Sequence, residues 1–228
     1  MEKKIKPIKN AYTHISVILD RTGSMDEIRD DTIGGFNTFL GEQKKQKAKA
    51  TLTLVQFDSK DPYEVIHRFK AIGEVPELTR ETYVPRASTP LFDALGRGIN
   101  DLEKSLASIV KKDRPQKVVF AVVTDGQENA SHEFSKQQVV KMIREKTEKE
   151  KWQFVFLSAD LGAIDEARDL GVSINASLAY EKNAMGTRGA WDSLSKSAAK
   201  FRSSGNPDMA FEPKDRKYQQ DSGKKKKK

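Results

Sequence analysis

Apolar residues gather in short segments that have the length of β-strands. In three of them, His14–Leu19, Lys117–Thr124 and Trp152–Ser158, the apolar run is nearly unbroken. Strands of this kind are buried on both faces, as in a parallel sheet. Shorter or more mixed segments predict three further strands, at Thr51–Phe57, Tyr63–Phe69 and Val172–Ile174.

Between these strands, apolar residues recur with the spacing of amphipathic α-helices. The segment 91–109 is the most regular, and Thr89-Pro90 before it predicts a capping threonine followed by proline at the first helical position. Ser135 and Gln138 have the spacing of a capping box before another helix. Strands that alternate with helices predict an α/β fold with helices on both faces of the sheet. The helical segments are 28–40, 91–109, 139–143, 164–170 and 191–201.

Two glycines, Gly34 and Gly35, fall inside the first predicted helix. A glycine in a helix interior costs about 1 kcal/mol relative to alanine. We expect close packing of this helix on the sheet to be the reason for them. The two tryptophans, Trp152 and Trp191, are expected in the core.

The composition is typical of a globular protein. Hydrophobic residues make up 36% and charged residues 32% of the 228 positions, which suits one sizeable domain with a charged surface. No apolar stretch approaches the ~18 residues of a membrane span, and the first residues lack the apolar segment of a secretory signal. The absence of cysteine excludes disulfides, thiolate metal sites and cysteine nucleophiles. Because it also fits a reducing compartment, we expect a cytoplasmic protein.

Positive charge is concentrated at the end of the chain. The formal net charge is +8, and the run Lys224–Lys228 contributes strongly to it. We expect an N-terminal arm over 1–12, one domain over 13–203, and a basic, disordered tail over 204–228, because the sequence after Ser203 is polar. The plainest interpretation of the tail is a solubilising segment, with weak contact to nucleic acid or an anionic surface as the alternative.

Oxygen-bearing side chains occur at three junctions between predicted elements. Ligands of open α/β sheets bind outside the carboxyl ends of the strands, so side chains at these junctions are expected to meet. They supply carboxylates and hydroxyls but no imidazole or thiol, which favours Mg²⁺, Mn²⁺ or Ca²⁺ over zinc or copper. A site with so few protein ligands leaves a coordination position open. The junctions are Asp20-Arg21-Thr22-Gly23-Ser24, Ser88-Thr89 and Thr124-Asp125-Gly126.

A purely structural interpretation of the hydroxyls is also open. Ser24 and Thr89 each precede a helix, so each can serve as an N-cap. Ser88 is an alternative to Thr89 as a ligand, although Thr89 directly precedes Pro90. Caps alone do not explain an aspartate at the end of two strands.

In this order, the three junctions resemble the metal-ion-dependent adhesion site of the von Willebrand factor A family. The resemblance runs from about Ile15 to Phe201, and the run from Leu19 to Leu40 is most similar to bacterial and phage, intracellular members. It implies a Rossmann-like, doubly wound, mostly parallel six-stranded sheet with one antiparallel edge strand. The matching motifs are Asp20-x-Thr22-x-Ser24, Thr89 before Pro-Leu-Phe-Asp-Ala-Leu, and Thr124-Asp125-Gly126.

The resemblance also implies a set of metal ligands. Thr22, Ser24 and Thr89 would provide hydroxyl oxygens, and Asp20 and Asp125 would act directly or through water, from neighbouring strands at the switch point of the sheet. Mg²⁺ is the expected ion, with Mn²⁺ or Ca²⁺ as alternatives, and an acidic side chain of a partner protein takes the sixth position. Position 22 departs from the family, which usually has serine there; the added methyl group stiffens the rotamer.

Two further residues are candidates for contact with the partner. Arg21 would pair with an incoming carboxylate if its side chain faces the metal, although the second residue of this loop more often points away. Glu128 is close to Asp125 in sequence, and its plainer interpretation is a solvated loop residue.

The expected function is metal-dependent binding of a protein, without catalysis. One alternative is a Mg²⁺-dependent phosphotransferase or phosphatase of the haloacid dehalogenase type, with Asp20 as the nucleophile. That chemistry needs an acid/base two residues later, where Thr22 stands. Another alternative is a regulatory subunit that recruits an ATPase through the same centre.

Overall fold

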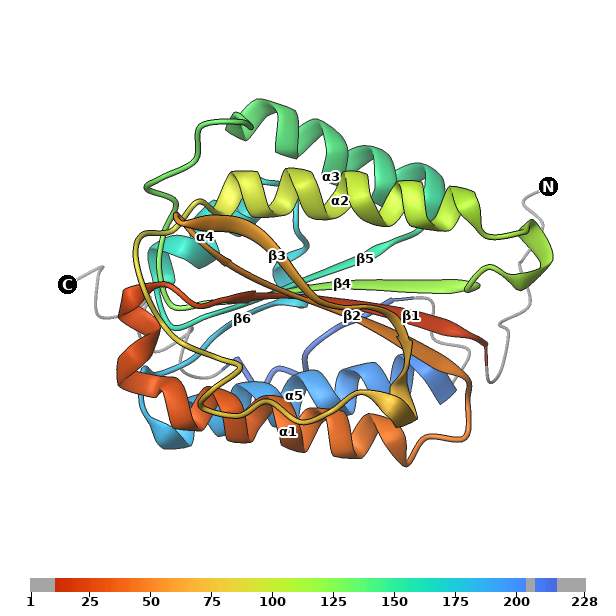
Figure 1. Cartoon of the computed structure of the whole chain (residues 1–228), viewed down its shortest axis with the longest axis horizontal. Helices are drawn as coiled ribbons and strands as arrows, with labels where there is room; N and C mark the ends of the chain where they lie inside the picture. Colours follow the sequence, from red (N-terminus) through yellow and green to blue (C-terminus); the bar gives the residue numbers. More distant parts are fainter. Residues whose placement is uncertain (1–10, 204–207, 217–228) are drawn as a thin grey trace.

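Strands and helices alternate along the chain around one central sheet (Figure 1). The computed structural model describes residues 11–203 and 208–216. The sheet has six strands in the order β3-β2-β1-β4-β5-β6. All neighbouring strands pair in parallel except β3, which pairs antiparallel with β2 at the edge. The strands are β1 Thr13–Asp20, β2 Ala50–Asp58, β3 Asp61–Ala71, β4 Lys117–Thr124, β5 Gln153–Ser158 and β6 Ser177–Ala179.

Helices cover both faces of this sheet, so the predicted doubly wound α/β architecture is confirmed. In Figure 1, α2 and α3 lie on one side of the sheet, and α1 and α5 lie on the other. The α-helices are α1 Arg29–Lys44, α2 Leu91–Ser108, α3 Lys136–Glu150, α4 Leu161–Asp169 and α5 Ala184–Ser203. Short 3-10 helices are η1 Gly23–Ile28, η2 Ile72–Glu74, η3 Lys111–Asp113 and η4 Ile174–Ala176.

The central strand β1 is buried along its whole length. Its side chains alternate between the two faces, because successive strand residues point in opposite directions. Val17 and Leu19 pack in the core that includes α1 and α5, and Ile18 packs in the core that includes α2, α3 and α4. Double-sided burial explains why this strand has an unbroken apolar sequence.

The strand order changes direction between β1 and β4, which pair in parallel with Leu19 opposite Val123. Asp20 and Thr124 therefore end two adjacent strands at the switch point of the sheet. In open α/β sheets this is where ligands bind. The resemblance implied this neighbourhood, and the structure confirms it.

Two predicted boundaries are wrong. The last strand is Ser177–Ala179, not Val172–Ile174, because a turn at Gly171, which has a φ of +89°, and the 3-10 helix η4 come first. The helix α2 begins at Leu91, so Pro90 is its N-cap residue and not its first helical residue. The capping box of Ser135 with Gln138 is present as predicted.

We expected the glycines of α1 to allow close packing on the sheet. Gly35 instead makes room for another helix, α5. A Cβ added to Gly35 would lie 2.1 Å from Cδ1 of Trp191, which belongs to α5. At Gly34 an added Cβ would meet nothing within 4 Å. Trp191 is buried and packs edge-on against Phe36, so it is a core residue as predicted.

The predicted domain end at Ser203 is too early. Met209 and Phe211 are buried in the same core as α1 and α5. The backbone N–H of Phe211 donates to the carbonyl of Asn175, which fixes the segment beside η4. The segment 208–216 thus belongs to the domain, whereas most of the predicted N-terminal arm and the lysine run Lys224–Lys228 lie outside the described residues. No helix in the described part of the chain is long and apolar enough to span a membrane.

Candidate metal centre

The loop after β1 folds back over the end of its own strand. The backbone N–H of Thr22 donates to Oδ1 of Asp20 at 2.7 Å, which closes a tight turn. The N–H of Gly23 donates to the carbonyl of Ala87 at 3.0 Å, so the loop is also tied to the segment before α2. These two contacts place the hydroxyls of Thr22 and Ser24 beside the end of the sheet.

Hydroxyl groups link the two aspartates of the sequence motif. Oγ1 of Thr22 lies 3.2 Å from Oγ of Ser24, and Oγ of Ser24 donates to Oδ1 of Asp125 at 2.6 Å. The hydroxyl of Thr124 donates to Oδ2 of Asp20. Side chains from the ends of β1 and β4 therefore form one continuous polar cluster.

The third junction joins this cluster through Thr89. A Cβ built on Gly126 would lie 3.6 Å from Oγ1 of Thr89 and 4.0 Å from Oγ of Ser24, so both hydroxyls face the same small space. Asn129 fixes the position, because its Oδ1 accepts from the N–H of Thr89 at 2.8 Å. Thr89 is buried and Ser88 is exposed, which favours Thr89 as the candidate ligand.

Helix capping does not account for these hydroxyls. Neither η1 nor α2 has a side-chain hydrogen bond at its N-cap. Ser24 lies inside η1, and its hydroxyl donates to Asp125 instead of accepting from a helix N–H. The structural interpretation of Ser24 and Thr89 as caps is therefore wrong.

Burial gives the Asp20 carboxyl unusual properties. The residue is 0% exposed, and desolvation raises its pKa from 3.8 to about 7, with a further contribution from the charge of Asp125. Hydrogen bonds from Thr124 and Thr22 favour the charged form and only partly offset the burial. The Tyr83 hydroxyl donates to the Asp20 carbonyl at 2.6 Å, and the residue is buried in the core that includes α1 and α5.

The residues present fit a hard divalent cation. Two buried carboxylates and three hydroxyls provide only oxygen atoms, which Mg²⁺, Mn²⁺ and Ca²⁺ accept. Oδ2 of Asp125 is buried and makes no well-aligned hydrogen bond within the described residues, and the ammonium group of Lys182 lies 3.0 Å from it. Within that same part of the chain, no three His, Cys, Asp or Glu side chains come together, and the hydroxyls are thus needed to complete a ligand set. The five predicted ligands meet in space; their binding of a metal stays a prediction.

The side chain of Arg21 pairs with residues outside this cluster. Its Nε donates to Oδ2 of Asp58 at 2.6 Å, and its Nη1 pairs with Glu64. Asp58 is fully buried and also pairs with Arg86 at 2.9 Å. The positive charge of Arg21 is thus balanced by carboxylates of the β2–β3 edge, which gives this residue a structural role and does not support the predicted contact with a partner.

Glu128 is likewise occupied by local contacts. Its Oε2 accepts from the backbone N–H of Phe92 in the first turn of α2 at 2.9 Å, and its Oε1 accepts from the N–H of Ser131 at 2.6 Å. The residue closes the helix N-terminus instead of standing free in a solvated loop. A contact between Glu128 and a partner has no support in this geometry.

Two residues near the centre were missed in the sequence. Lys182 pairs with Oδ2 of Asp125 at 3.0 Å, and the Tyr180 hydroxyl is buried without a hydrogen-bond partner among the described residues. Burial and the charges of Asp125 and Asp20 raise the pKa of Tyr180 above its usual range. Tyr180 directly follows β6 and Lys182 lies two residues further on, so the rule that ligands bind at strand ends would have pointed to them had the strand been predicted in the right place.

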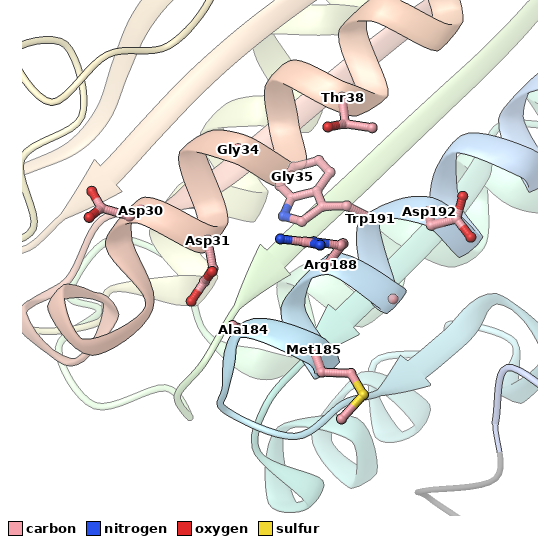
Figure 2. A pocket seen from close by; sticks show the side chains of 11 residues that line it. Asp30, Asp31, Gly34, Gly35, Thr38, Ala184, Met185, Arg188, Trp191 and Asp192 are labelled. Carbon is pink, nitrogen blue, oxygen red and sulfur yellow. The ribbon is translucent and has the colours of Figure 1, made fainter.

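A separate groove of about 880 Å³ runs between α1 and α5. Figure 2 shows the side chains of Asp31, Met185 and Arg188 around it, with Trp191 beneath Gly35. Met185 is 79% exposed, which is unusual for so large an apolar residue. None of the predicted metal ligands lines this groove, so it is distinct from the candidate centre.

Comparison with known proteins was informative at the level of structure alone. No family model matches the sequence, and no curated protein matches it. A solved structure of proximal thread matrix protein 1 from the mussel byssus, with a zinc-occupied MIDAS motif, is 14% identical with a TM-score of 0.58, and the match covers 86% of this chain and 48% of that one.

Three further solved structures show the same likeness. The pilus adhesin SpaC of Lactobacillus rhamnosus GG matches with a TM-score of 0.62 and 12% identity over 87% of this chain and 31% of that one. Manganese-loaded TRAP protein of Plasmodium vivax matches with a TM-score of 0.53 and 13% identity over 79% of this chain and 73% of that one. Matches to the mussel protein and the adhesin span about half of those chains or less. A von Willebrand factor type A structure from Catenulispora acidiphila matches as well, with a TM-score of 0.54 and 11% identity over 83% of this chain and 43% of that one. This chain therefore has the fold of the von Willebrand factor A domains.

Proposed function

We propose that this domain binds a divalent cation, Mg²⁺ in the first place, at the cluster of Asp20, Thr22, Ser24, Thr89 and Asp125, and uses it to hold an acidic side chain of a protein partner. The observation that carries the proposal is the meeting of oxygen ligands from three separate loops at the switch point of the sheet. Zinc- and manganese-containing structures with the same fold support a divalent ion at such a site.

The chain's own residues would prepare the centre for this task. Asp20 and Asp125 provide negative charge in a place from which water is largely excluded, where electrostatic attraction to a cation is strong. Thr22 and Ser24 hold their hydroxyls at a fixed separation. A bound cation supplies a Lewis-acidic position that attracts a carboxylate. Binding of a partner is then expected to depend on the cation and to be lost with a chelator.

The geometry argues against the phosphatase alternative. A nucleophilic carboxylate must reach its substrate, yet Asp20 is fully buried and both its oxygens accept hydrogen bonds. The threonine at position 22 offers no carboxyl acid/base. We propose a binding function without turnover, in the cytoplasm as the cysteine-free sequence suggests, and recruitment of an ATPase remains one form that such binding can take.

Calorimetric titration of the chelator-treated protein with Mg²⁺, Mn²⁺ and Ca²⁺ tests the proposal. The wild type is expected to bind one ion, and Asp20→Asn is expected to lose the binding, because it removes one charge and keeps the shape. Asp30→Asn is the matched control, since Asp30 is an exposed carboxylate on α1 paired with Arg80. Equal binding by wild type and Asp20→Asn would remove the site.

A second experiment addresses the partner. Immobilised wild type and Asp20→Asn are exposed to a cell extract with Mg²⁺ or with a chelator, and the bound proteins are compared. We expect proteins that are retained by the wild type with Mg²⁺ alone. Hydrolysis of a generic phosphate ester that requires Mg²⁺ and Asp20 would favour the enzyme instead.

A further inference from the structure

A lysine already stands at the candidate centre. Lys182 lies in the loop between β6 and α5, and its Nζ is 3.0 Å from Oδ2 of Asp125 and 3.0 Å from Oε2 of Glu27. Its side chain is 30% exposed, whereas that of Asp125 is 0% exposed. The loops after β4 and β6 and the 3-10 helix η1 thus hold one ammonium group between them.

This contact neutralises one particular atom. Oδ1 of Asp125 accepts the hydrogen bond from Ser24, which leaves Oδ2 to Lys182. Oδ2 makes no well-aligned hydrogen bond, so the ammonium acts on it through charge at close range. A buried carboxylate without any counter-charge is strongly unfavourable, and Lys182 relieves this cost.

A divalent ion at the centre needs the same carboxylate. An ammonium group and a metal ion close to one another repel, and the repulsion is large where water is scarce. We propose, on the basis of the function inferred above, that Lys182 is an internal counter-cation that competes with the divalent ion for Asp125 and so lowers the affinity of the centre for that ion.

Glu27 offers a second partner to the ammonium group of Lys182 when a cation displaces it from Asp125. Its carboxylate is 69% exposed and already contacts Lys182, so the lysine can leave Asp125 without losing every partner. The carboxylate of Glu27 then neutralises the ammonium group, which reduces the repulsion between Lys182 and the cation. Glu27 therefore favours binding of the ion, because it can retain the ammonium group of Lys182 once the cation has displaced it from Asp125.

Calorimetric titration with Mg²⁺ and with Mn²⁺ of the full chain and three variants tests this competition. Lys182→Met is expected to bind the ion about tenfold more tightly than the wild type. Lys196→Met is the matched control: it removes one positive charge from an exposed lysine on α5 that pairs with Asp192, and its affinity should stay within about twofold of the wild type. Glu27→Gln should weaken binding in the wild type and do so much less in the Lys182→Met background, as double-mutant cycles resolve for residues in contact.

The melting temperature supplies a second readout that does not depend on measuring affinity. With a chelator present, Lys182→Met should melt below both the wild type and Lys196→Met, because Asp125 loses its counter-charge. Excess Mg²⁺ should remove that difference. If the wild type binds the ion and Lys182→Met binds it equally or more weakly, the competition is overturned and the proposed function is left intact. If neither the wild type nor Lys182→Met binds the ion, both the competition and the proposed function are overturned.

Discussion

Replacing Asp20 by asparagine should remove a specific pH dependence of stability. In the folded protein, burial raises the pKa of Asp20 from 3.8 to about 7, so folding without a metal takes up a proton at intermediate pH. An acid whose pKa is raised by folding contributes stability at low pH, and that stability is lost as pH rises towards the folded value. The unfolding free energy of the wild type should therefore fall between about pH 4 and pH 7 and level off above it.

The size of this effect follows from the pKa shift. A shift from 3.8 to about 7 corresponds to about 4 kcal/mol at about 1.4 kcal/mol per pKa unit. Asparagine at position 20 cannot ionise, so the variant should lack this slope and be more stable than the wild type at pH 8 when no metal is present. A cation that binds the ionised carboxylate should offset this difference, since a concentration about a thousandfold above Kd adds about 4.1 kcal/mol to the stability of the wild type alone.

Urea denaturation measures the effect. Unfolding curves are recorded from pH 4 to pH 8, with a chelator or with Mg²⁺, for the wild type, Asp20→Asn and the control Asp30→Asn. Other carboxyl groups titrate over the same range, but their contribution cancels in the difference between the wild type and Asp20→Asn. An identical pH slope in both proteins would refute the reasoning, because it would mean that Asp20 ionises freely in the fold.

Three further predictions concern residues outside the metal ligands. Gly35→Ala should lower the free energy of unfolding in urea by more than about 2 kcal/mol, because the added Cβ would lie 2.1 Å from a tryptophan ring of α5. The control Gly34→Ala should be neutral or stabilising by up to about 1 kcal/mol, because an added Cβ there meets nothing within 4 Å. Similar losses in both variants would contradict the close packing at Gly35. Arg21→Met should lower the free energy of unfolding by about 3 kcal/mol, because it removes one of the cations that neutralise the buried Asp58. Its calorimetric affinity for Mg²⁺ should stay unchanged. Loss of that affinity with normal stability would mean that Arg21 takes part in binding. Phe211→Ala should lower the free energy of unfolding by about 3 kcal/mol, because it opens a cavity in the core. An unchanged midpoint of urea unfolding would mean that the segment 208–216 does not pack on the domain.

Much of the architecture was readable from local sequence. The unbroken apolar run of β1 is explained by burial on both faces, and the capping box at Ser135 formed as its spacing predicts. The last strand was predicted at Val172–Ile174 instead of Ser177–Ala179, because three residues carry too little periodicity to distinguish a strand from a loop. Tyr180 and Lys182 were missed for the same reason.

Only tertiary structure could decide how charges and glycines are partnered. The sequence brings Arg21 next to Asp20 along the chain, yet its guanidinium pairs with Asp58 and Glu64 on another strand pair. Gly35 likewise faces a tryptophan of the last helix, which lies more than a hundred positions away in sequence. Local sequence determines which residue types end each strand, because strand and helix periodicity are local properties. Which side chain meets which depends on the packing of distant elements, and that packing alone placed Lys182 beside Asp125.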